Sequence, residues 1–163
     1  MRQPKYRLEV VLDARGRKKD EAARFVAVRR QELLQAEDEL KRRINFLEDC
    51  RRKQKEAHEK MMSEFNAGSQ AGNIVAHRNF LQVLKDKEEE LLFLVEEQKI
   101  EAKKAEERVD EALDLLAEAS KELKVIEKHK EKWKEAVKRE REKQEQKISD
   151  EIGAILHQRT DKL

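Results

Sequence analysis

Apolar residues recur at alternating steps of three and four from Leu81 to Val137, over eight heptads without a slip. This 3.5-residue repeat places one narrow apolar stripe on one side of an α-helix, and such a stripe is the seam of a coiled coil. A helix cannot cover its own stripe, so a second helix has to pack against it. Fourteen of the seventeen seam positions are apolar, and the full set is Leu81, Leu84, Glu88, Leu91, Val95, Gln98, Ala102, Ala105, Val109, Ala112, Leu116, Ala119, Leu123, Ile126, Lys130, Trp133 and Val137.

A second apolar seam lies earlier in the chain. Its steps of 4,4 and then 3,3 around Ile44 predict a stutter and a stammer, where the supercoil relaxes and tightens. Cys50 lies within it and is interpreted as a small apolar residue rather than a reactive thiol. The predicted members of this seam are Val26, Leu33, Ala36, Leu40, Ile44, Leu47, Cys50, Ala57, Met61 and Phe65.

Between the two seams, residues 66–73 (NAGSQAGN) form the only turn-like cluster in the interior. Short connections join antiparallel helices. The sequence therefore predicts an all-α fold, a long antiparallel two-helix coiled-coil hairpin. Its helices cover about 6–65 and about 77–158, its loop covers about 66–76, and residues 1–163 form one domain. We expect one chain to form the hairpin as a monomer, although two long helices could also pair between chains as a dimeric scaffold.

With Phe65 placed near Phe80, the numbers of paired residues are predicted to sum to roughly 145, give or take one helical turn. This register leaves residues 145–163 as an unpaired C-terminal overhang. The overhang still carries an apolar stripe, which favours either a frayed helix end or a segment that docks on a partner. The stripe consists of Ile148, Ile152, Ile155 and Leu156.

Charge supports the pairing of the two halves. Charged residues make up 45% of the chain, but the net charge is only +2 and identifies no partner class. Residues 1–65 hold 18 basic and 13 acidic side chains, whereas residues 78–128 hold 10 basic and 15 acidic ones. Complementary flanks suit two helices lying side by side. The polar seam residues Glu88, Gln98 and Lys130 are predicted to fix the register.

The sequence indicates no catalytic, metal or cofactor site. A two-helix fold offers no concavity in which side chains converge, so we do not expect an enzyme. The basic clusters at 15–19 and 51–53 are small and lack aromatic neighbours, which argues against nucleic-acid binding. No stretch is long and apolar enough for insertion into a membrane, no export signal is visible, and Cys50 is alone. We therefore expect a cytoplasmic protein.

Four stretches together resemble the YscO/FliJ-like family of type III secretion and flagellar export, and its YscO-like branch in particular. They are residues 5–12 (KYRLEVVL), 79–84 (NFLQVL), 129–136 (HKEKWKEA) and 150–157 (DEIGAILH). The resemblance implies a hairpin similar to the coiled coil of the rotary ATP synthase gamma subunit. It also implies a central stalk that binds the export ATPase hexamer at its open end, the export-gate cytoplasmic domain, and secretion chaperones.

The candidate partner-binding residues lie near the two ends of the predicted hairpin. Phe80 and Leu84 match the family's gate contact, whereas Lys87 departs from the small apolar residue expected there. Further aromatic residues near the turn indicate either a broader core or an apolar patch that could also serve an escort protein for chaperones. At the open end we expect a terminal apolar clamp, and Ile152 and Ile155 complete the candidate set. The aromatic residues near the turn are Phe46, Phe65, Phe80 and Phe93, and the clamp consists of Tyr6, Leu8, Leu12 and Trp133.

Overall fold

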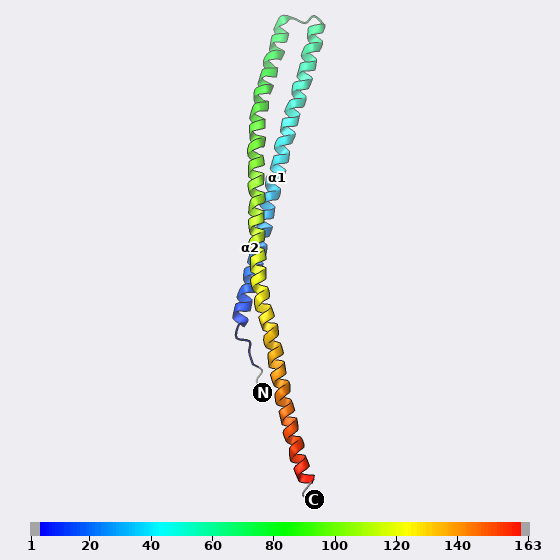
Figure 1. Ribbon diagram of the computed structural model, residues 1–163. Coiled ribbons are helices and arrows are strands. Elements are labelled where there is room, and N and C mark those ends of the chain that lie inside the picture. Colours follow the sequence, from blue (N-terminus) through cyan, green and yellow to red (C-terminus); the bar gives the residue numbers. More distant parts are fainter. Residues whose placement is uncertain (1–3, 161–163) are drawn as a thin grey trace. The chain divides into compact units, whose positions relative to one another are not determined.

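The computed structural model describes residues 4–160, excluding the side chains of residues 158–160. Its two helices are α1 (Glu9–Asn66) and α2 (Ala71–Thr160), and the described residues contain no strand (Figure 1). The predicted all-α two-helix hairpin is confirmed. Residues 1–3, which precede the first predicted helix, and residues 161–163, which belong to the predicted C-terminal overhang, lie outside the described residues.

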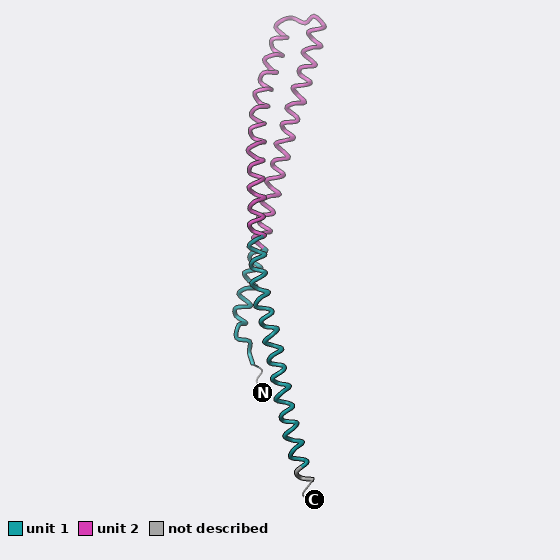
Figure 2. Tube along the Cα trace, in the orientation of Figure 1, with its two compact units in different colours: residues 1–23, 114–163 teal, residues 24–113 magenta. Residues whose placement is uncertain are grey.

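The chain divides into two units (Figure 2). Unit 1 combines residues 1–23 with residues 114–163, and unit 2 consists of residues 24–113. Each unit contains a segment of α1 and a segment of α2 that pack side by side in opposite directions. Unit 2 also contains the turn between the helices.

The seam predicted on α2 is confirmed. Every one of its positions between Leu81 and Val137 is buried or half-buried. The deepest of them is Ala112, with no exposed surface, and Ala105 and Ala119 are also buried. Small side chains at these positions allow a close approach of the other helix.

The seam of α1 differs from the prediction at three positions, which are those of Arg43, Gln54 and Glu64. Burial follows an unbroken 3–4 repeat from Leu33 to Glu64, so the predicted stutter and stammer are wrong. Arg43 takes the seam position, and Ile44 lies half-buried beside it. A long arginine stem can cover apolar surface while its guanidinium reaches out, and here Nη1 donates to the carbonyl of Leu94 at 2.8 Å. Phe65 is 63% exposed, and Glu64 replaces it on the seam.

The loop is shorter than predicted and covers only residues 67–70. Gly68, at φ +76°, ends α1 with two hydrogen bonds that run back into the helix. The amide of Gly68 donates to the carbonyl of Phe65, and the amide of Ser69 donates to that of Glu64, both at 3.1 Å. This pair of bonds is a Schellman motif. Helix α2 then begins at once, so residues 71–76 are helical rather than part of the loop.

The shorter loop also moves the register. In unit 2 the contacting residues sum to 134 for Cys50 with Leu84 and to 142 for Gln54 with Glu88. In unit 1 they sum to 139 for Tyr6 with Trp133. The predicted sum of about 145 is therefore too high by roughly one heptad. The predicted seam positions of α2 are still correct, because a pairing that is shifted by seven residues brings the same faces of the two helices together.

The predicted contact between Phe65 and Phe80 is wrong for the same reason. At the turn, Glu64 lies beside His77 instead, and Nε2 of the histidine donates to the carboxylate at 2.8 Å. Further along α2, every described side chain from residue 138 to residue 157 is exposed. Within the described part of the chain, neither helix is apolar over a length that could cross a membrane.

Candidate partner-binding surfaces

An aromatic cluster in unit 1 holds the segment around Tyr6, just before α1, against α2. Tyr6 lies in the short segment before α1 and is only 8% exposed. Its ring centroid is 5.2 Å from that of Trp133 and 5.7 Å from that of His129, both at tilted angles. Its hydroxyl lies 2.7 Å from Nδ1 of His129 and donates to it when that nitrogen carries no proton. The ring of Tyr6 is therefore packed against α2, and its hydroxyl has a hydrogen-bond partner.

Lys130 completes this cluster. Its ammonium lies 5.9 Å from the centroid of the Tyr6 ring and 2.6 Å from a carboxylate oxygen of Glu9. We use the name aromatic cluster for Tyr6, His129, Lys130 and Trp133. The predicted contact between Tyr6 and Trp133 is present. Sequence reasoning did not assign His129 to this site, although it lies next to a seam position.

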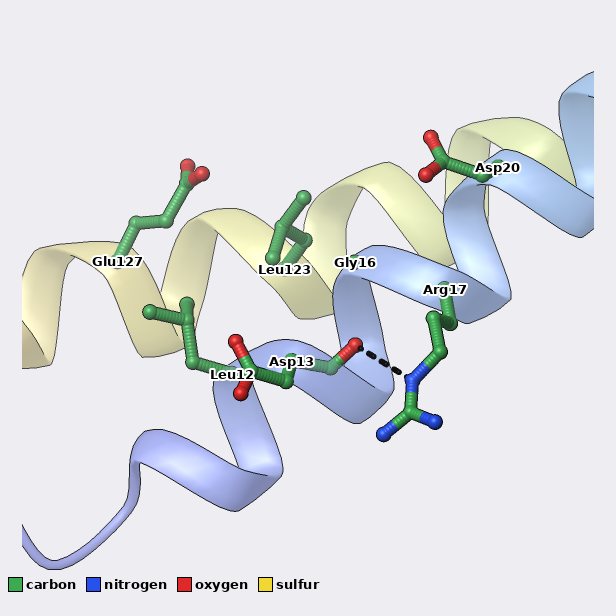
Figure 3. A pocket seen from close by; sticks show the side chains of 7 residues that line it. All are labelled: Leu12, Asp13, Gly16, Arg17, Asp20, Leu123 and Glu127. Atoms are coloured by element: carbon green, nitrogen blue, oxygen red, sulfur yellow. Dashed lines mark hydrogen bonds between the residues drawn. The ribbon is translucent and has the colours of Figure 1, made fainter.

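Leu8 and Leu12, the other members of the predicted clamp, are half-buried. Leu12 lies further along α1 and borders a shallow, open depression together with Leu123 of α2 (Figure 3). Gly16 contributes to this depression because a Cβ there would meet nothing within 4 Å. The carboxylates of Asp20 and Glu127 lie at opposite ends of it and do not converge (Figure 3).

An ion-pair group next to this depression links the two helices of unit 1. Glu122 of α2 accepts from Lys18 at 2.9 Å and also pairs with Arg15. The hydrogen bond from Lys18, followed by the charge of Arg15, lowers the pKa of the Glu122 carboxyl from its ordinary value. The cations come from α1 and the acid from α2, as the charge distribution predicted.

The aromatic residues of unit 2 are exposed. Phe46, Phe65, Phe80 and Phe93 all keep more than half of their surface accessible, and Phe93 keeps 70%. The broader core considered for them does not form, so they remain available as an apolar surface. Leu84 differs from Phe80, because its side chain is buried against α1 and its carbonyl accepts from Cys50 and Gln54. Lys87 is exposed.

Two of the polar seam residues have partners across unit 2. Glu88 accepts from Nε of Arg51 at 2.7 Å and from Nε2 of Gln54 at 2.8 Å. These two hydrogen bonds, that of Arg51 first, lower the pKa of Glu88. Gln98 donates to the carbonyl of Ala36 at 3.0 Å. Gln54 was not predicted as a seam residue, although it lies one heptad beyond Leu47.

The C-terminal stripe is exposed along its whole length. Ile148, Ile152, Ile155 and Leu156 lie on a part of α2 where every described side chain is exposed. Gly153 interrupts the stripe, and nothing lies within 4 Å of the place where its Cβ would be. Ile152 and Ile155, the two predicted site residues here, are therefore accessible and lie on the same side of the helix.

The family model described as YscO-like protein matches residues 3–162. The chain belongs to the YscO-like family. It is thus a type III secretion-associated coiled-coil protein. One solved structure, described as that of a YscO homolog, CT670 from Chlamydia trachomatis, has the same fold. It matches with a TM-score of 0.80 at 24% sequence identity, over 95% of this chain and 96% of that one. No curated protein matches the chain.

Two of the stretches that resemble the YscO-like family meet in the structure. Tyr6 comes from residues 5–12, and His129, Lys130 and Trp133 come from residues 129–136. These stretches are more than a hundred positions apart in the sequence, as the separation of 123 between Tyr6 and His129 shows. In this YscO-like protein they form one contact, the aromatic cluster of unit 1.

Proposed function

We propose that this YscO-like protein is a non-enzymatic central-stalk component of a type III export apparatus. It acts at the cytoplasmic face, where unit 1 binds the export ATPase hexamer and the surface around Phe80 contacts the export gate. The observation that carries the proposal is the exposed C-terminal stripe on a helix that continues beyond the aromatic cluster. Ile148, Ile152 and Ile155 of this stripe are about half exposed, and a ring of ATPase subunits around them would cover them.

Two features of unit 1 support an ATPase contact. The aromatic cluster holds residues 6–9 against α2, so the N-terminal segment and α2 present one ordered surface rather than two loose ends. The stripe supplies apolar anchors at spacings of four and three, which is how an amphipathic helix engages a surrounding surface. Preformed order lowers the entropy cost of binding.

The test uses the purified full-length protein and its cognate export ATPase. The wild-type chain is expected to promote ATPase hexamers and to raise their turnover. Ile152→Ser combined with Ile155→Ser should weaken this effect by about tenfold, because buried apolar anchors dominate interface energies. Val125→Ser is the matched control, since Val125 is an exposed apolar residue of α2 in unit 1 outside the stripe. The proposal fails if the wild-type chain leaves ATPase assembly unchanged, or if both variants behave alike.

A second candidate role is that of an escort protein for secretion chaperones. The exposure of Phe80 and Phe93 in unit 2 favours it, because large accessible aromatic side chains mark binding surfaces. Phe80→Ala with Phe93→Ala should then abolish chaperone binding, while stimulation of the ATPase persists. Loss of both activities together would point to a single shared surface and against a separate escort role.

The stalk role also requires that one chain form the hairpin. Glu64→Cys with His77→Cys, at two residues that contact each other across the turn, tests this in a Cys50→Ala background. We expect cross-links within one chain and sedimentation as a monomer. Links that form only between chains would favour the dimeric scaffold.

A further inference from the structure

Helix α2 carries a short apolar row on its outer side in unit 2. Phe93 is two positions away from both Leu91 and Val95 of the seam, which places it on the opposite side of the helix. Ile100 lies one heptad further along and projects from the same side. Phe93 is 70% exposed and Ile100 is 56% exposed. We call this surface, from residue 89 to residue 104, the Phe93 face.

The charges of the Phe93 face differ between its two ends. On a helix, the nearest surface neighbours of a residue lie three and four positions away. On its N-terminal side Phe93 has Glu89 and Glu90 as such neighbours, whereas Ile100 has Lys103 and Lys104 on its C-terminal side. Residues 96 and 97, both glutamates, lie between the two apolar residues. The face is therefore acidic at one end and basic at the other.

The central glutamates have partners within the chain. Glu96 pairs with Lys99 at 2.6 Å, and Glu97 pairs with Arg43 at 3.7 Å.

The charges at the two ends are less well matched. Lys104 pairs with Glu101 at 2.8 Å through side chains that are about half exposed. Glu89, Glu90 and Lys103 make no ion pair with any residue that the structure describes. The two ends of the face thus offer opposite charges to a partner.

We infer that the Phe93 face binds the same face of a second copy of this chain, with the two α2 helices antiparallel. A two-fold axis between residues 96 and 97 sets Phe93 of each copy beside Ile100 of the other, because 93 and 100 are equally far from that point. The same axis sets Glu89 beside Lys103 on one edge of the contact and Glu90 beside Lys104 on the other. Each of these pairs forms twice.

Other pairings of the two helices fit less well. A parallel pair would set every charged residue against its own copy, and like charges across an interface are repulsive. An antiparallel pair shifted by one heptad would set Ile100 against Asp86 in one direction, or Phe93 against Glu107 in the other. Only the axis between residues 96 and 97 matches apolar residues and opposite charges together.

The contact is small, so the association is weak. Each copy contributes two apolar anchors, far less than the 1,200 Å² or more that a stable interface buries in total. Glu96 and Glu97 approach their own copies at the axis, where their ion pairs within the chain reduce the repulsion. Asp86 and Glu107 lie beyond the anchors, where helices that cross at an angle have separated. We expect a dissociation constant of about 0.1 mM, and a monomer at micromolar concentration.

The inference is independent of the stalk role, because it uses no residue of unit 1. Its assay needs only the full-length chain, so its failure and that of the ATPase assay are distinguishable. Sedimentation equilibrium of the wild-type chain between about 0.01 and 0.5 mM should show a monomer that becomes a dimer as the concentration rises.

The first variants test the apolar anchors. Phe93→Gln with Ile100→Gln should weaken dimerisation at least about tenfold, because buried apolar anchors dominate interface energies. Both sites are exposed, so circular dichroism should show unchanged helicity. Val125→Gln, an exposed apolar control on α2 in unit 1, should change dimerisation by less than about twofold.

Charge reversal tests the pairing. Glu89→Lys with Glu90→Lys leaves only lysines at the ends of the face, and Lys103→Glu with Lys104→Glu leaves only glutamates. Each variant alone should dimerise at least several-fold more weakly than the wild type. An equimolar mixture of the two should form heterodimers at least as well as the wild type forms dimers, because every edge pair then joins a lysine to a glutamate.

Three results would overturn the inference. The first is a wild-type chain that stays monomeric up to about 0.5 mM, which would leave the face to a different protein. The second is a dimer that Phe93→Gln with Ile100→Gln leaves unchanged, which would place the contact elsewhere, for instance on the C-terminal stripe. The third is a mixture of the two charge-reversed variants that associates no better than either variant alone.

Discussion

Helix α2 carries apolar side chains in two settings. Between Leu81 and Val137 the stripe faces α1 and is buried or half-buried throughout, whereas between Ile148 and Leu156 it is exposed. In both stripes the apolar residues follow the spacing of an α-helix. The difference shows that the pattern fixes which side of the helix is apolar, and that burial depends on whether another helix lies beside it. The stripe that faces α1 contributes to the stability of the fold, whereas the exposed stripe is accessible to a binding partner.

The largest expected effect is on the free energy of unfolding, and it is tested by comparing one substitution in the buried stripe with one in the exposed stripe. Val95→Asp places a carboxylate at a site that is 4% exposed, without a cation to pair with it. We expect a loss of about 3–4 kcal/mol in the free energy of unfolding, because an unpaired charge is costly to bury. Ile152→Asp, in the exposed stripe, should change it by less than about 0.5 kcal/mol. Urea unfolding at neutral pH, followed by circular dichroism, measures both. Similar losses at the two sites would show that the C-terminal stripe is covered in solution.

The aromatic cluster marks the limit of the covered stretch in unit 1. Tyr6→Ala removes the ring contacts with Trp133 and His129, and it should lower the local stability of residues 9–12 by about 2 kcal/mol. Amide hydrogen exchange measures this as faster exchange at the start of α1. Tyr6→Phe keeps the ring and loses only the hydroxyl, so we expect a smaller loss of about 1 kcal/mol. Unchanged exchange in Tyr6→Ala would mean that the cluster does not hold the N-terminal segment.

The seam of α2 between Leu81 and Val137 was predictable because a pairing that is shifted by one heptad still buries the same side of the helix. The seam of α2 was identified residue by residue, even though the predicted register was wrong by about one heptad. The error arose at Gly72 and Asn73, which are typical turn residues but lie in the first turn of α2. The Schellman motif at Gly68 had already ended α1, and this geometry depends on a positive φ that composition does not reveal.

The seam of α1 was predicted less well because apolarity alone was used to choose its members. Ile44 was preferred to Arg43, and Gln54 was missed, since long polar side chains can lie on a seam and reach partners at its edge. The contact between Tyr6 and Trp133 was predicted, but the hydrogen bond to His129 was not. That bond depends on the register, which the length of the loop determines.

Two glycines, Gly16 inside α1 and Gly68 in the loop that follows it, should respond to substitution with opposite signs. Gly68→Ala places a Cβ at φ +76° and should cost about 1 kcal/mol, because residues with a side chain avoid the left-handed region. Gly16→Ala lies inside the helix with free space around it and should stabilise by about 0.5–1 kcal/mol. Thermal unfolding of the two variants measures both. A destabilising Gly16→Ala would mean that the depression around Gly16 is occupied in solution.

The smallest expected effect concerns pH and the polar part of the seam. The hydrogen bonds from Arg51 and Gln54 hold the pKa of Glu88 below its ordinary value of 4.5. A carboxyl with a lowered pKa stabilises the fold above its unfolded value, and this stabilisation is lost as the pH falls through the lower, folded value. Glu88→Gln should therefore be less stable than the wild type at neutral pH, by at most about 1 kcal/mol, since solvent screens partly exposed pairs.

This difference should shrink as the pH falls below 4.5, which urea unfolding across a pH series measures. In an Arg51→Met background the same substitution should matter less at neutral pH, because the largest cause of the lowered pKa is then absent. An equal effect in both backgrounds would contradict the assignment to Arg51. Arg51 and Gln54 belong to α1, and Glu88 belongs to α2. The difference between the effects of Glu88→Gln in the two backgrounds therefore measures the interaction between the two helices at this part of the seam.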